Sequence, residues 1–220
     1  METCIDSVKR IVTWIFIAFG FSVAIRFLFL LDLNKRVYNH VPGDCRIVNK
    51  ITNGSAGIEL VDELGVAFIT SGLAKVRGVQ RVVGRIHMYN FTQNNRKFEA
   101  NRIRIEGSEF DRRSFTPNGI SSYVSNGRVT LYVINNRPGN HSVEVFSYDK
   151  DRNSLTHRKS IHDPTFTNPF DIAAVGPDRF FLTNYVYMDK RWAQLVELAF
   201  QTSFGSIVYY DGKKTSYLEK

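Results

Sequence analysis

The chain has 220 residues, of which 43% are hydrophobic and 23% charged, a composition typical of globular proteins and unlike that of disordered or fibrous chains. The net charge is +8, but the basic residues are scattered singly, which indicates a solvated basic surface and not a nucleic-acid site. The only cysteines, Cys4 and Cys45, are too few for a disulfide-dense secreted module or a cysteine-based zinc site.

The first predicted element is a membrane span at residues 11–31, which contain a single charge, Arg26. At about 1.5 Å per residue, this length crosses a hydrocarbon core of about 30 Å. A buried core helix is disfavoured because apolar residues cover every face, and a cleaved signal peptide because no small-residue cleavage site follows. We therefore expect an uncleaved signal anchor, with a short cytosolic tail at 1–10 and a linker at 32–44.

The orientation of this span is not decided by charge, since two basic residues precede it and two follow it. Three N-glycosylation sequons after the span decide it instead: Asn53, Asn90 and Asn140. We therefore expect a single-pass type II membrane glycoprotein whose C-terminal part faces the endoplasmic reticulum (ER) lumen or the cell exterior. Cys4 and Cys45 would then lie on opposite sides of the membrane and would not pair.

From Cys45 onward, short apolar runs alternate with turn residues, as in an all-β sandwich, barrel or propeller. The runs that we predict as strands lie at 65–72, 85–91, 129–135, 143–148, 171–175, 179–184 and 206–210. Turns are expected at Gly176-Pro177-Asp178 and Asp211-Gly212. One helix is predicted at 189–200, and the polar segment 153–168 is predicted as an exposed strand and loop.

The residues themselves narrow this choice, because several stretches resemble the paraoxonase/arylesterase family in order and spacing from about residue 40 to 220. The stretches that carry the resemblance are DCRIV at 44–48, GSAGIEL at 54–60, GVAFITSGL at 65–73, GSEFD at 107–111, SFTPNGIS at 114–121, VINN at 133–136, SVEVF at 142–146, DIAAVGP at 171–177 and VYY at 208–210.

The resemblance implies a fold, a six-bladed β-propeller with two calcium ions in its central tunnel, of which residues 45–220 would form about half. It also implies that Cys45 matches a cysteine whose disulfide partner lies near the family's C-terminus and is absent here. Half a propeller would expose sheet faces and strand edges. The chain is therefore expected to be a truncated isoform, a half-propeller completed by a partner, or a poorly folding product.

The resemblance also implies a chemistry, in which calcium polarises an ester or lactone carbonyl and a histidine pair helps to activate water. The positions that match the histidine pair hold Asn118 and Asn136. An amide does not take up a proton near neutral pH, so neither residue can replace a histidine as a base. We therefore assign no catalytic residue.

The positions that match the calcium ligands are also changed. Ala56, Gly57 and Phe170 stand where the family has oxygen-bearing side chains, whereas Asp171 and the backbone carbonyl position Ile120 remain as metal-site remnants. Calcium prefers 6–8 oxygen ligands. We therefore expect no cofactor, with calcium bound only if the site is rebuilt from other residues.

No other motif points to a different chemistry. The five histidines lack the spacing of a metal site, and no nucleophile elbow, Walker loop or dinucleotide fingerprint occurs. The sequence thus favours a non-catalytic, paraoxonase-like membrane protein that acts by protein binding. Nematode proteins of this kind assist the assembly of degenerin-type sodium channels, which makes an accessory or chaperone role at a channel the leading hypothesis. The alternative is a calcium-dependent arylesterase or lactonase, and a nucleic-acid partner is not expected.

Overall fold

The computed structural model of the chain describes residues 2–31, 35–36, 43, 45–72, 82–92, 98–108, 110–137, 139–186, 188, 190–199 and 204–219. Most of the predicted linker at 32–44 lies outside these residues. The chain divides into two compact units, one made of 1–45 with 195–202 and the other of 46–194 with 203–220.

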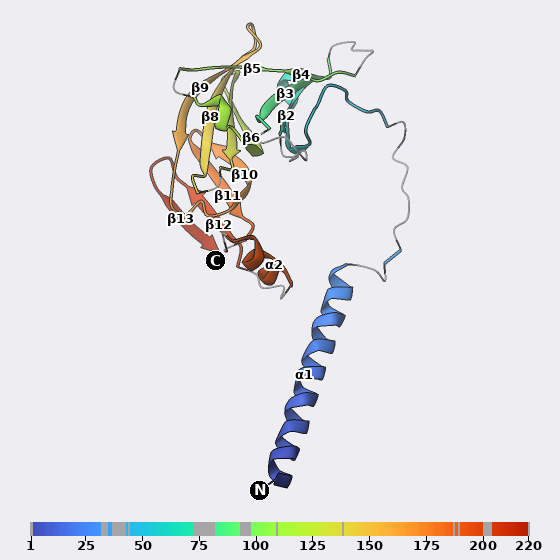
Figure 1. The fold of residues 1–220 in the computed structure, drawn as a ribbon. Helices are drawn as coiled ribbons and strands as arrows, with labels where there is room; N and C mark the ends of the chain where they lie inside the picture. Colours follow the sequence, from blue (N-terminus) through green and yellow to red (C-terminus); the bar gives the residue numbers. More distant parts are fainter. Residues whose placement is uncertain are drawn as a thin grey trace. The chain divides into compact units, whose positions relative to one another are not determined.

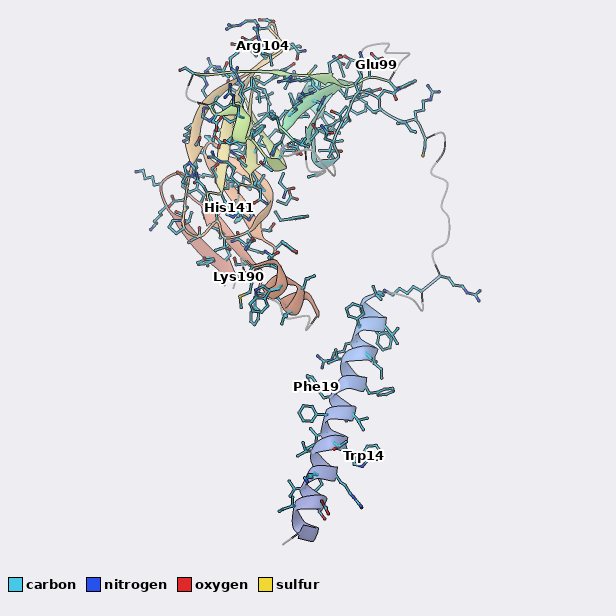
Figure 2. All side chains as sticks on the ribbon, viewed as in Figure 1. Trp14, Phe19, Glu99, Arg104, His141 and Lys190 are labelled. Carbon is cyan, nitrogen blue, oxygen red and sulfur yellow. The ribbon has the colours of Figure 1, made fainter. Side chains whose placement is uncertain are left out.

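The N-terminal unit is dominated by the helix α1, Glu2–Leu30. Its segment Ile5–Phe29 is long and apolar enough to cross a membrane. Figure 2 shows side chains such as Trp14 and Phe19 projecting from it on different sides, and both are exposed. The helix begins nine residues before the predicted span at 11, because residues 2–10 contain neither proline nor glycine to end it. A helix with apolar residues all round suits a lipid environment.

The described residues of the second unit form thirteen strands in three sheets, which confirms that it is mostly β. Figure 1 shows their arrangement. The first sheet holds β1 Ser55–Val61, β2 Val66–Ser71, β3 Arg85–Asn90 and β4 Asn101–Arg102. The second holds β5 Arg104–Glu106, β6 Pro117–Ser125, β7 Arg128–Asn135, β8 Ser142–Asp149 and β9 Ser154–Ile161. The third holds β10 Pro169–Gly176, β11 Arg179–Asn184, β12 Ser206–Tyr210 and β13 Thr215–Glu219. The remaining elements are the short 3-10 helices Asp62–Leu64 and Arg112–Ser114 and the helix α2, Arg191–Ala199.

Each sheet is an antiparallel meander in which consecutive strands pair, except that β5 pairs in parallel with β9 at the outer edge of the second sheet. The β6–β7 hairpin turns at Asn126-Gly127, and both residues have positive φ, as a tight two-residue hairpin requires. The strands β1, β6 and β10 are each an edge strand of one sheet, and they hold the positions of interest.

The predicted strands are all found, and so are the helix near 189–200 and the two predicted turns. Five of the described strands were not predicted, namely β1, β4, β5, β6 and β13. The strand β6 was missed because it begins with the turn-like residues Pro117-Asn118-Gly119. The pairing of β6 with β7 shifts register between Pro117 and Ile120, so these residues can belong to the strand. Proline is tolerated at the first position of a strand. The segment 153–168 does contain a strand, but β9 pairs on both sides and is buried at its two ends.

The core contains two large apolar layers, one on each face of the second sheet, and a small third cluster of Ile69, Tyr89 and Ala100 at the first sheet. Phe68, Ile86 and Phe146 belong to the layer shared with the first sheet. Tyr132 and Phe180 belong to the layer shared with the third sheet. The second sheet thus lies between the other two (Figure 1), which explains why β7 is buried on both faces.

Polar contacts join the edge strands of neighbouring sheets. The Glu59 carboxylate on β1 accepts hydrogen bonds from the backbone N–H and the hydroxyl of Ser122 on β6, at 2.7 and 2.6 Å. The Ser121 hydroxyl accepts from the Ala174 N–H on β10 at 3.1 Å. These bonds fix β1, β6 and β10 side by side.

Candidate functional site

The positions predicted from the resemblance converge where β1, β6 and β10 lie side by side. The backbones are so close that a Cβ added at Gly57 would lie 2.8 Å from the Asn118 carbonyl oxygen. A Cβ added at Gly119 would likewise lie 2.8 Å from the Asp171 carboxylate. The tertiary structure therefore gathers residues more than a hundred positions apart into one place, which we call the inner-edge site (Gly57, Asn118, Ile120, Phe170 and Asp171).

The backbone at this site is fixed by Thr70, a fully buried residue of β2. Its hydroxyl accepts a hydrogen bond from the Gly57 N–H at 2.9 Å and donates one to the Asn118 carbonyl at 2.8 Å. A buried backbone polar group without a partner costs free energy, and Thr70 satisfies one on each strand. Thr70 lies in the family-like stretch at 65–73, but sequence reasoning did not single it out because a threonine inside an apolar strand has no recognisable role of its own.

The oxygen donors at the inner-edge site are few. Asp171 supplies a carboxylate, one oxygen of which accepts the Ile172 N–H at 2.9 Å. The Phe170 side chain is 56% exposed and its ring lies 5.8 Å from that of Tyr185. Among the residues that the structure describes, no group of three His, Cys, Asp or Glu side chains is placed to hold a metal ion. One carboxylate with backbone carbonyls does not fit the 6–8 ligands of calcium.

Asn118 and Asn136 lie one residue to either side of the paired Pro117 and Asn135. Asn118 is buried on β6. The Asn136 side chain donates to the Pro169 carbonyl at 3.3 Å and so links the second sheet to the start of β10. As amides, both residues can position a polar group, but neither can accept a proton near neutral pH.

The other predicted positions lie away from this site. Asn53 and Asn140 are exposed, and the Asn90 side-chain oxygen accepts from the backbone N–H and hydroxyl of Thr92 at 2.8 and 2.7 Å. Cys45 is exposed and has a free thiol. Glycosylation of the sequons remains a prediction, and so does the correspondence of Cys45 to a cysteine of the family.

A buried polar network in the second sheet was not foreseen. Glu144 on β8 is only 2% exposed, and its carboxylate accepts from Ser142 at 2.6 Å and from Asn135 at 3.1 Å. His157 at 2.9 Å and Ser160 complete its partners. Burial alone would raise the pKa of Glu144, but these hydrogen bonds outweigh it and lower the pKa below its usual value. The sequence did contain a signal for this network, because Glu144 occupies a position of the predicted strand at 143–148 that faces inward.

Comparison with known proteins places the chain in a family. The arylesterase family matches residues 29–219. Mechanosensory abnormality protein 6 of Caenorhabditis elegans is 38% identical over 95% of this chain and 57% of its own length. Serum paraoxonase/arylesterase 2 of Gallus gallus is 34% identical over 78% of this chain and 48% of its own length. Human serum paraoxonase/arylesterase 1 is 32% identical over 76% and 47%.

Among solved structures, the GH43_1 enzyme from Xanthomonas citri complexed with xylose aligns with a TM-score of 0.42 and 10% identity, over 78% of this chain and 56% of that enzyme. A likeness of that size supports no conclusion about fold or activity. The chain spans about half the length of the curated relatives that it matches. By the extent of the family match and the identity to its relatives, the chain belongs to the arylesterase family.

Proposed function

We propose that this chain is a non-catalytic member of the arylesterase family, anchored in the membrane by α1, that acts by binding another protein. The anchor would be a type II signal anchor, with the sheets in the ER lumen or at the cell surface and with glycans on Asn53, Asn90 and Asn140. The three sheets would correspond to about half of a six-bladed propeller.

The observation that carries this proposal is the composition of the inner-edge site. Lewis-acid catalysis of ester hydrolysis requires a cation held by several hard oxygen ligands. Ala56 and Gly57 offer no side-chain oxygen, and the close approach of the β6 backbone to Gly57 leaves no room for a longer side chain. Asp171 alone supplies a carboxylate, so we propose that it and Ile120 are remnants of a calcium site.

The absence of a base supports the same proposal. Asn118 and Asn136 occupy the positions of the family's histidine pair, and Asn136 is already engaged by Pro169. A general base must take a proton from water at the working pH, which an amide does not do. Binding then remains as the activity that this fold can offer.

The partner that we propose is a membrane protein, in the first instance an ion-channel subunit, which this chain would assist during assembly. The support is the name of the nematode relative, which refers to a mechanosensory abnormality, together with the family match. Co-purification of a channel subunit with the wild-type chain, from cells that express both, is the direct test.

The alternative function, a calcium-dependent arylesterase or lactonase, is favoured by the family match and by the retained Asp171. Assays of the full chain in detergent with phenyl acetate and with a lactone, in calcium and in EDTA, separate the two. We expect no hydrolysis above that of an Asp171→Asn variant. Hydrolysis that is lost both in EDTA and in Asp171→Asn would overturn the non-catalytic proposal.

A further inference from the structure

A polar groove of about 630 Å³ lies between the second and third sheets, away from the inner-edge site. β6 runs from Asn118 in that site to Ser125 in the groove, and β10 runs from Asp171 to the turn Pro177-Asp178 in the groove wall. The groove and the inner-edge site therefore lie at opposite ends of the same two strands.

The floor of the groove is one face of the second sheet. Tyr123, Thr130 and Ser147 are cross-strand neighbours, and Val145 is opposite Lys159. Side chains that are paired across strands project from the same face. The floor of the groove is thus a row of side-chain hydroxyl groups beside the apolar side chain of Val145.

The charge of the groove is positive. Its lining includes the cations Arg128, Arg158 and Lys159 and a single carboxylate, that of Asp178. Lys159 and Asp178 form an ion pair at 2.9 Å. Arg128 and Arg158 are exposed and form no ion pair with any described residue. Two guanidinium groups therefore remain available, on β7 and β9, which are separated by β8. In the strand register Arg158 is level with Leu131 and Tyr132 and not with Arg128, so the two backbone positions are about 15 Å apart.

The far wall of the groove is held in place before any ligand arrives. The Asp178 N–H donates to the Tyr132 hydroxyl at 2.8 Å, and Asp178 has a positive φ of 54°. Tyr132 is buried, and burial together with the nearby Asp178 charge raises the pKa of its hydroxyl, which stays protonated. A wall fixed by a buried tyrosine does not need to be ordered on binding.

We propose that this groove binds an acidic segment of the partner protein, in which two carboxylates engage Arg128 and Arg158. This inference rests on the proposed binding function. Guanidinium groups pair with carboxylates in a bidentate manner, and the hydroxyls of Ser125, Thr130 and Ser147 can serve the peptide groups between them. Two unpaired cations match a segment with two carboxylates better than a densely sulfated glycan, which carries many more charges.

The test uses the full chain in detergent micelles and a fluorescein-labelled heptapeptide with two glutamates four residues apart, a spacing of about 14 Å in an extended segment. We expect saturable binding that weakens with added salt, and no binding of the same peptide with glutamines. The double variant Arg128→Gln/Arg158→Gln should bind about tenfold more weakly or worse. The matched control, Arg112→Gln/Lys213→Gln, removes two positive charges outside the groove and should bind like the wild type.

A heparin-derived oligosaccharide is tested as a third ligand. Three results would overturn this assignment: equal affinity for the two peptides, an equal loss of affinity in the groove and control variants, or binding of the oligosaccharide without binding of the glutamate peptide. Equal thermal unfolding midpoints for the two double variants guard against misfolding. The underlying proposal fails separately. If a channel subunit still co-purifies with the groove variant, the groove is not the binding site but the proposed binding function stands. If no partner co-purifies with the wild type, the proposed binding function itself is rejected.

Discussion

Two polar regions of the molecule, the Glu144 network and the inner-edge site, differ in how completely their groups are paired. Around Glu144, in the interior of the sheet, each carboxylate oxygen accepts two hydrogen bonds, and only Ser160 of the four donors is exposed. At the inner-edge site, Ala56, Gly57 and Phe170 stand where the family resemblance expects oxygen ligands. A buried network is costly to alter, because every lost member leaves partners unpaired. A site at an open strand edge can lose its side chains at little cost to folding.

The largest effect is expected where the network is broken. Glu144→Ala would leave Asn135, Ser142, His157 and Ser160 without their common acceptor in the interior. We expect a loss of about 3 kcal/mol in the free energy of unfolding, measured by urea denaturation of the full chain in detergent. Asp171→Asn, at the exposed remnant, is the matched control and should change stability by no more than about 0.5 kcal/mol. Equal losses of unfolding free energy in the two variants would show that the two regions do not differ in their importance for stability.

A smaller effect is expected where the backbones of the inner-edge site meet. Gly57→Ala places a Cβ against the Asn118 carbonyl oxygen and the Ile120 N–H, so we expect a destabilisation of about 1–3 kcal/mol. Ala56→Ser, at the exposed neighbouring position, should be close to neutral. Thermal unfolding followed by circular dichroism checks both. A neutral Gly57→Ala would mean that the site has room for the ligand side chain of the family.

The pH dependence of stability sharpens the comparison further. His87 is buried beside Ser71, and its pKa is lowered by burial and by the charges of Arg85 and Arg102. Because the folded pKa lies below that of the unfolded chain, about 6.5, the unfolded chain binds the proton first. The stability that neutral His87 contributes is therefore complete above about pH 6.5 and is lost as the pH falls towards the folded pKa.

The measurement is the unfolding midpoint at about pH 7.5 and about pH 5.5. We expect the midpoint of the wild type to fall on acidification, and His87→Gln to fall by less. Glu144 has a lowered pKa as well, so its contribution is lost only in stronger acid, below the usual carboxyl pKa. An identical midpoint shift in His87→Gln would show that other groups govern the acid response.

The smallest effect, close to zero, is expected from calcium. A ligand at a hundred times its Kd would stabilise a folded protein by about 2.7 kcal/mol. With one carboxylate at the inner-edge site, we expect millimolar calcium to leave the unfolding midpoint of the wild type unchanged. A calcium-dependent rise that Asp171→Asn abolishes would show that the site had been rebuilt.

Much of the architecture was accessible from local patterns. Strands such as β7 and β12 follow from short apolar runs bounded by turn residues, and α1 follows from a long apolar run; these local preferences agree with the final fold. β6 was not accessible, because Pro117-Asn118-Gly119 reads as a turn until its neighbours supply the pairing. The start of α1 at Glu2 was not predicted either, since the apolar pattern marks the span and not the start of the helix.

The sequence by itself determined the family, an apolar segment long enough to cross a membrane, and the identity of the residues at each functional position. Only the tertiary structure brought Gly57, Asn118 and Asp171 together and showed the Thr70 contacts that close their backbones around one another. It alone also showed the buried network of Glu144 and the groove near Arg128. The physical reason is that side-chain chemistry is a local property, whereas proximity and burial depend on how distant strands pack.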